Sequence, residues 1–83
     1  MKLKIEQVYT IIKNALMSDD VINEDSNTEN TEEWDSLGHL SILSALDKEF
    51  QGATSKITKL NEVKSVKEIV GILKSNELLE DEH

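Results

Sequence analysis

The feature that most constrains this chain is the spacing of its apolar residues, which recur every three or four positions in separate segments. Such spacing places side chains on one face of a helix and predicts amphipathic helices. A helix of this kind cannot bury its apolar face alone, so several of them must share a core. The clearest case is residues 3–16, where the apolar face consists of Leu3, Ile5, Val8, Ile11, Ile12, Ala15 and Leu16.

Two further segments carry the same signal. A second helix is predicted after Asp35, a suitable N-cap, and before Gly52, with an apolar face of Leu37, Leu40, Leu43, Leu46 and Phe50. A last helix follows Ser65 and Glu68, which form a capping-box pattern ahead of a stripe at Val66, Ile69, Val70 and Leu73. In residues 53–62 only Ile57 and Leu60 supply a weak face, which suits a short third helix or a structured turn. The predicted fold is all-α, a small four-helix bundle.

Residues 18–33 are polar almost throughout and predict a long loop between the first and second helices. A loop of this length in a compact domain often has a function. Val21 and Ile22 interrupt it and are expected to pack into the bundle. With 83 residues the chain fits one domain, predicted over residues 1–76, followed by a polar C-terminal tail over residues 77–83.

The net charge of -8 is concentrated in one part of the sequence, because Asn14 to Asp47 holds nine acidic residues and no Lys or Arg. Nucleic acid and anionic membranes would be repelled by such a surface, whereas a partner with a basic patch would be attracted. Acidic runs also serve as solvated loops, so charge alone leaves both readings open. The sequence shows neither a signal peptide nor a run of about 20 apolar residues, so we expect a cytoplasmic protein without membrane insertion.

Ser36 is the residue with the most chemical interest, since it stands where the acidic loop meets the second helix. Its hydroxyl should be exposed, while Leu37 should turn inward and anchor the junction. The unpaired amides at a helix N-terminus favour a phosphodiester attached at such a serine. Asp-Ser is also an ordinary capping sequence, so the tripeptide Asp35-Ser36-Leu37 has little specificity by itself.

In its context, however, Asp35-Ser36-Leu37 resembles the phosphopantetheine attachment motif of the acyl carrier protein family, in which Asp-Ser-Leu opens the second helix of a four-helix bundle. The resemblance extends over nearly the whole chain. It includes the chain length, the long loop before the motif, the capped last helix and the downstream pairs Ala45-Leu46 and Glu49-Phe50.

The resemblance implies that Ser36 receives a 4'-phosphopantetheine group from coenzyme A by the action of a phosphopantetheinyl transferase. The thiol of this arm would carry acyl groups as thioesters, which would supply the thiol that a chain without cysteine lacks. The protein would then be no enzyme, but a monomeric carrier that presents intermediates of fatty-acid, lipid or related biosynthesis to loading and processing enzymes with basic docking patches. Asp35 and Leu37 would flank the arm, and the expected partner contacts are Glu32, Glu33, Gly38, His39 and Ser41.

The chain departs from housekeeping fatty-acid carriers, which have a strongly acidic second helix and third segment. Here Ser41 and Ser44 lie along the second helix, and lysines occur at 48, 56 and 59. A carrier dedicated to one pathway is therefore expected. A peptidyl-type or D-alanyl-type carrier that holds an aminoacyl thioester on the same serine remains an alternative, as does an unmodified helical interaction protein.

Three other features of the sequence resemble parts of functional sites. Asp19, Asp20 and Asp25 suggest an EF-hand, but counting from Asp25 puts Asn30 where the loop needs Gly and Ser36 where it needs Glu, so no metal site is predicted. His39 has no second catalytic group beside it and is expected to be a surface residue. Trp34 is expected to pack the end of the loop onto the bundle.

Overall fold

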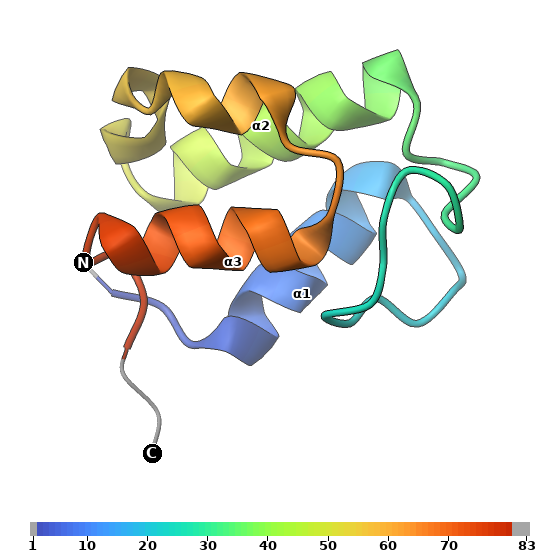
Figure 1. Ribbon diagram of the computed structural model, residues 1–83, viewed down its shortest axis with the longest axis horizontal. Coiled ribbons are helices and arrows are strands. Elements are labelled where there is room, and N and C mark those ends of the chain that lie inside the picture. Colours follow the sequence, from blue (N-terminus) through green and yellow to red (C-terminus); the bar gives the residue numbers. More distant parts are fainter. Residues whose placement is uncertain (1, 81–83) are drawn as a thin grey trace.

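The computed structural model describes residues 2–80 and is all-helical over this range, with no β-strand. It contains three α-helices, α1 (Ile5–Leu16), α2 (Ser36–Glu49) and α3 (Val66–Ser75). Two short 3-10 helices, η1 (Ala53–Lys56) and η2 (Thr58–Glu62), connect α2 to α3. Residues 17–35 pass from the end of α1 to the start of α2 at one end of the molecule (Figure 1). No helix in the described range is long and apolar enough to cross a membrane.

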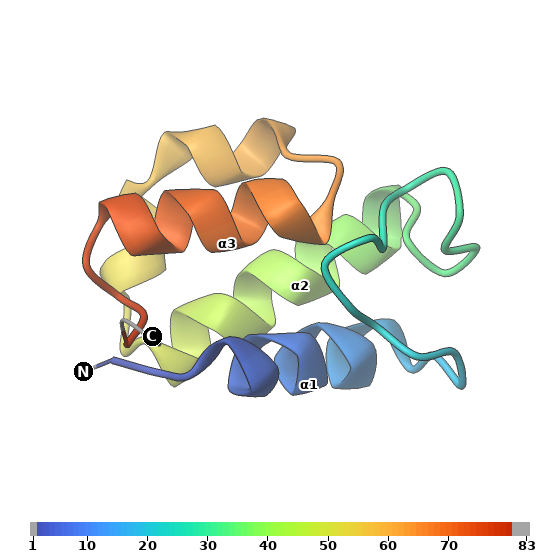
Figure 2. The same ribbon diagram turned by 60° about the horizontal axis from the view of Figure 1, so that its bottom comes forward.

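The helices pack around one core. α1 lies along α2, and α3 contacts both α1 and η2. Figure 2 shows the 3-10 pair beside α3, on the side away from α1. Because each element contributes at least one fully buried side chain or packs beside one, the elements depend on one another for stability. The buried apolar residues are Leu3, Val8, Ile12, Leu16, Ile22, Trp34, Ile42, Leu46, Phe50, Leu60, Val63, Val66, Ile69, Leu73 and Leu79.

The predicted face of α2 was partly wrong. The helix buries Ile42, Leu46 and Phe50, each four residues from the next, whereas Leu43 is only half-buried. Leu37 and Leu40 are 75% and 61% exposed. The reason is that α2 carries apolar residues around most of its circumference, so spacing alone does not determine which stripe faces the core.

The connection between α2 and α3 is a pair of 3-10 helices and not a third α-helix. Ile57 separates the two with φ -97° and ψ 89°, which is not a helical conformation. Leu60 is buried, as its place in the weak apolar pattern predicted. This segment is therefore held by packing of single side chains and not by a continuous helical face.

Polar contacts fix the segments that precede α2 and α3. Ser65 accepts a hydrogen bond from the amide of Glu68 at 3.1 Å, as the predicted capping box requires. The Glu68 carboxylate accepts one from the amide of Lys64, one residue before the N-cap, at 3.0 Å. Residues 26–28 pair with residues 64–66 through two backbone hydrogen bonds of 2.9 Å.

In the 17–35 segment Ile22 is buried, but Val21 is 78% exposed, contrary to expectation. Neighbouring residues of a non-helical segment point to different sides, so only one of the two can reach the core.

The first part of the predicted C-terminal tail, residues 77–83, packs against the folded unit. The amide of Leu3 donates to the carbonyl of Leu78 at 3.1 Å, and the amide of Glu80 donates to the carbonyl of Leu3 at 2.8 Å. Leu79 is buried against the core. Residues 77–80 thus belong to the folded unit, because an apolar residue there completes the core. Residues 81–83 of the predicted tail lie outside the described residues.

Leu46→Ala tests this core. The Leu46 side chain has no exposed surface, and truncation of such a leucine typically costs about 2–5 kcal/mol, a large part of what a small domain has. We expect a molten or unfolded chain by thermal denaturation and near-ultraviolet circular dichroism. Ser41→Ala, at an exposed position of the same helix, should leave the midpoint nearly unchanged. Equal midpoints for the two variants would contradict this packing.

Candidate functional site

Ser36 is the first residue of α2 and is exposed. Asp35 is the N-cap of this helix, and its Oδ1 accepts a hydrogen bond from the amide of Gly38 at 2.8 Å. The predicted cap is therefore confirmed. The other amides of the first turn remain free of intrahelical partners, as at any helix N-terminus, and give the surroundings of the Ser36 hydroxyl a partial positive charge.

The junction is anchored by Trp34 and not by Leu37. The Trp34 side chain is buried, whereas Leu37 points to solvent. The expectation that Leu37 turns inward was wrong, because Leu37 lies on the side of α2 opposite the buried Ile42 and Leu46. Leu37 and Leu40 instead form an exposed apolar pair on α2 beside Ser36.

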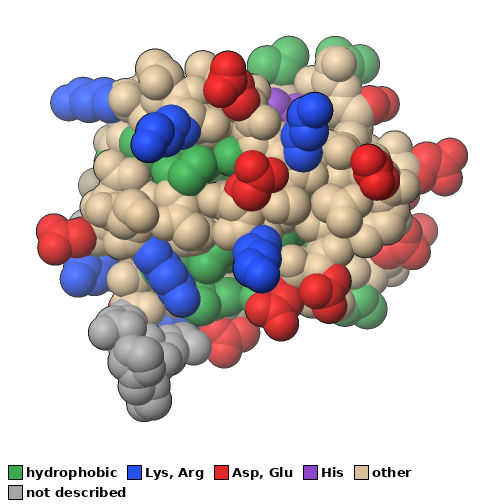
Figure 3. Space-filling view, in the orientation of Figure 1, with side chains coloured by type: hydrophobic (Ala, Val, Ile, Leu, Met, Phe, Trp, Pro, Cys, Tyr) green, Lys and Arg blue, Asp and Glu red, His purple; other side chains and the backbone are tan. Residues whose placement is uncertain are grey.

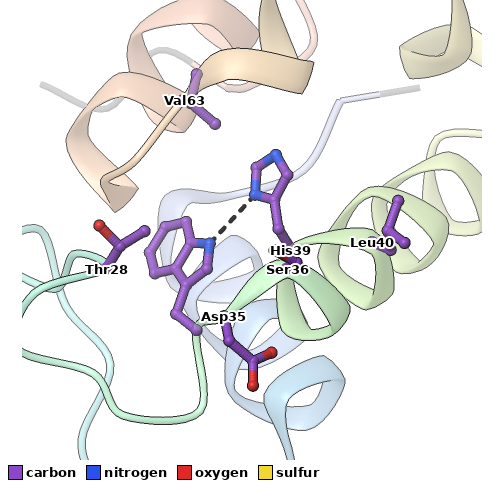
Figure 4. A pocket seen from close by; sticks show the side chains of 7 residues that line it. Thr28, Asp35, Ser36, His39, Leu40 and Val63 are labelled. Carbon is purple, nitrogen blue, oxygen red and sulfur yellow. Dashed lines mark hydrogen bonds between the residues drawn. The ribbon is translucent and has the colours of Figure 1, made fainter.

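His39 connects three segments of the fold, and Figure 4 shows its hydrogen bond to the tryptophan side chain. The indole Nε1 of Trp34 donates a hydrogen bond to His39 Nδ1 at 3.2 Å, and His39 Nε2 lies 3.0 Å from the carbonyl oxygen of Leu60 in η2. A carbonyl can only accept, so the neutral imidazole with its proton on Nε2 satisfies both bonds. The two rings are stacked, with centroids 6.3 Å apart and planes 13° apart. His39 is thus a half-buried bridge and not the surface residue that the sequence predicted.

A pocket of about 480 Å³ opens beside Ser36. It is shallow and largely open to solvent. Residues from three parts of the fold surround it, and Figure 4 shows them together. They are Thr28, Trp34 and Asp35 of the 17–35 segment, Ser36, His39 and Leu40 at the start of α2, and Val63 before α3. The pairing of residues 26–28 with 64–66 brings Thr28 and Val63 to this place.

The other predicted contact residues lie around Ser36 with unequal access. Glu32 and Ser41 are exposed, and Gly38 and His39 are half-buried. Glu33 is half-buried, and its Oε1 is buried without a hydrogen-bond partner among residues 2–80. On the face shown in Figure 3, acidic side chains gather over the end formed by the 17–35 segment, and most lysines lie toward the other end. Within the described residues, no three His, Cys, Asp or Glu side chains are grouped so as to hold a metal ion.

Comparison with known proteins gives no match, whether to family models, to curated protein sequences or to solved structures.

Sequence reasoning found Ser36 and its cap but missed the pocket and the Trp34–His39 pair. Val63 lines the pocket and the carbonyl oxygen of Leu60 contacts His39, and the fold brings both residues to α2 from more than twenty positions away in sequence. A tryptophan directly before a helix start and a histidine in its first turns were the only local signals.

Gly38 offers a test of how closely the site is packed. A Cβ at this position would overlap the carbonyl oxygen of Glu33 and press on the Leu16 side chain, so the approach of the loop to α2 requires glycine. We expect Gly38→Ala to lower the free energy of unfolding by about 1–3 kcal/mol, the usual cost of forcing extra atoms into a packed region.

Gly71→Ala is the matched control, because it lies in α3 with no atom near an added Cβ. Alanine is the better helix former, so this variant should gain about 0.5–1 kcal/mol. Urea denaturation of both variants measures the difference. A Gly38→Ala protein as stable as Gly71→Ala would contradict the close approach.

Proposed function

We propose that this protein is an acyl carrier that holds acyl intermediates as thioesters on a 4'-phosphopantetheine arm attached to Ser36. The observation that carries the proposal is the exposed hydroxyl of Ser36 at the first position of a capped helix, beside an apolar pocket and two exposed leucines. A separate transferase would add the arm, and the carrier itself would catalyse no step.

The attachment is a phosphoryl transfer from coenzyme A. The Ser36 oxygen would form a bond to the phosphorus that carries the pantetheine, the bond from that phosphorus to the phosphate of the nucleotide would break, and adenosine 3',5'-bisphosphate would leave. The hydroxyl proton would pass to a base of the transferase. The resulting phosphodiester carries a negative charge, which the amides and dipole of the α2 N-terminus favour.

The surroundings of Ser36 suit both the docking of a partner enzyme and the holding of the arm between encounters. The exposed Leu37 and Leu40 offer apolar contact to an enzyme that approaches the serine, and Glu32 and Asp35 offer charge to its basic residues. Between encounters, the pocket lined by Trp34, Leu40 and Val63 can shield part of the arm or its acyl group from water.

The proposed fold type is the acyl-carrier bundle, with residues 17–35 as its long loop and with η1 and η2 in the place of a third helix. Supporting this, α1, α2 and α3 follow the order that the resemblance to the family implies. The proposed carrier works as a monomer in the cytoplasm. Lysines 48, 56 and 59 favour enzymes dedicated to one pathway of lipid or related biosynthesis over those of general fatty-acid synthesis.

An aminoacyl carrier of the peptidyl or D-alanyl type would use the same serine and is the alternative within this class. An unmodified interaction protein is the alternative outside it, and the exposed Leu37 and Leu40 would then be its contact surface. Loading of Ser36 distinguishes the two classes.

The purified chain, incubated with coenzyme A and a broad-specificity phosphopantetheinyl transferase, should gain the mass of one arm. Ser36→Ala should abolish the gain, and Ser44→Ala, also an exposed serine of α2, should not. Intact-mass spectrometry measures both. Failure of the original chain with several active transferases would refute the carrier function.

The loading rate should depend on salt. Raising the salt from about 0.1 M to about 1 M shortens the screening length from about 10 Å to about 3 Å, so attraction between the acidic surface and a basic transferase should weaken and loading should slow several-fold. Glu32→Gln should show a smaller salt effect than the original chain. Rates that do not change with salt would rule out charge steering at this surface.

A further inference from the structure

The junction before Ser36 is held by one titratable side chain. His39 Nδ1 accepts a hydrogen bond from the indole Nε1 of Trp34 at 3.2 Å, and His39 Nε2 lies 3.0 Å from the carbonyl oxygen of Leu60. Imidazole is the side chain that ordinarily changes its charge between about pH 5 and about pH 8. Both contacts of the ring therefore depend on which of its nitrogens carry a proton.

The neutral and charged forms of His39 differ at one end of the ring. In the neutral form Nε2 carries the proton that the Leu60 carbonyl accepts, and Nδ1 has a lone pair for the indole. Protonation places a hydrogen on Nδ1, where the indole already directs its own. Two donors that face each other form no hydrogen bond, whereas the bond to Leu60 keeps its donor. Protonation therefore breaks the bridge at Trp34 alone.

Release of this bond affects the start of α2. The Trp34 side chain is buried, and a buried donor without a partner is unfavourable. Because the adjoining pocket is open to solvent, the indole is expected to turn toward it, where water can accept the bond. Trp34 directly precedes Asp35, the N-cap that holds the amide of Gly38. A movement of Trp34 thus reaches the first turn of the helix, which begins with Ser36.

We infer that protonation of His39 opens its bond to Trp34 and loosens the start of α2 around Ser36. The bridge stabilises this junction at neutral pH, and that contribution is lost as the pH falls. A consequence, which rests on the proposed function, is that Ser36 is loaded more slowly when His39 is charged. His39 acts here through Trp34 and is a positioning residue for the loading step.

No neighbouring carboxylate replaces Trp34 as a partner of the charged ring. Figure 4 shows the Asp35 side chain directed away from the imidazole, and one of its oxygens already caps α2. The first turn of α2 contains no acidic residue. Within residues 2–80, His39 makes no ion pair. The charged residues of the neighbouring segments are Glu32, Glu33 and Asp35 before α2, and Lys59, Glu62 and Lys64 in and after η2.

The test follows the indole proton of the unloaded, isotope-labelled chain by NMR. The sequence has one tryptophan, so it gives one indole signal. Its exchange with water is compared with that of N-acetyltryptophanamide at about pH 7.5 and about pH 5.5, a range above the ordinary titration of carboxylates. We expect the relative exchange rate to be about fivefold higher at the lower pH, the effect of one lost neutral hydrogen bond. The amide signals of Ser36 and Gly38 should shift with it.

Two substitutions of His39 imitate the two states without titrating. His39→Asn keeps an acceptor near the position of Nδ1, so Trp34 should stay bonded at both pH values. His39→Gln keeps a donor for Leu60 but provides no acceptor for the indole, so exchange should be fast at both. His83→Gln is the matched control, because His83 is the other histidine of the sequence. It should retain the pH response of the original chain.

Loading of Ser36 by a phosphopantetheinyl transferase tests the consequence. The transferase has a pH dependence of its own, so kcat/KM for the original chain is divided by the value for His39→Asn at each pH. This ratio should fall about fivefold between about pH 7.5 and about pH 5.5. The same ratio taken with His83→Gln should stay constant.

A relative indole exchange rate that is equal at the two pH values would overturn the inference. A pH response that persists in His39→Asn, or disappears in His83→Gln, would overturn it as well. A constant loading ratio beside a clear exchange response would remove His39 from the loading step. A chain that is loaded at neither pH refutes the carrier function instead, and the exchange experiment still decides whether the bridge opens.

Discussion

The hydrogen-bonded bridge from Trp34 through His39 to Leu60 is the interaction on which the site depends. It joins the end of the 17–35 segment, the start of α2 and the 3-10 helix η2, three parts that no regular element connects. Each His39 nitrogen has one partner, so the imidazole has a single orientation, and the indole is held against it. Ser36 stands between Trp34 and His39 in sequence, and its position beside the pocket that these residues line follows from this bridge.

The parts of the fold that local interactions determine could be predicted from the sequence. The caps at Asp35 and Ser65 and the faces of α1 and α3 follow from residues a few positions apart, and the structure confirms them. The face of α2 could not be predicted, because its apolar residues surround the helix and only packing against α1 selects Ile42 over Leu37. The burial of Leu79 and the bridge at His39 depend on contacts between distant segments, which spacing does not encode. The presence of a pocket beside Ser36 also depends on contacts between distant segments.

The buried position of Trp34 has a practical consequence for observing the protein. It is the only tryptophan of the chain, it lines the pocket beside Ser36, and its indole nitrogen donates to a histidine. Indole emission responds to the polarity and hydrogen bonding around the ring. The tryptophan fluorescence of this protein, excited where Tyr9 does not absorb, therefore originates beside Ser36, and its wavelength and intensity report on whether that pocket is filled by water or by an organic group.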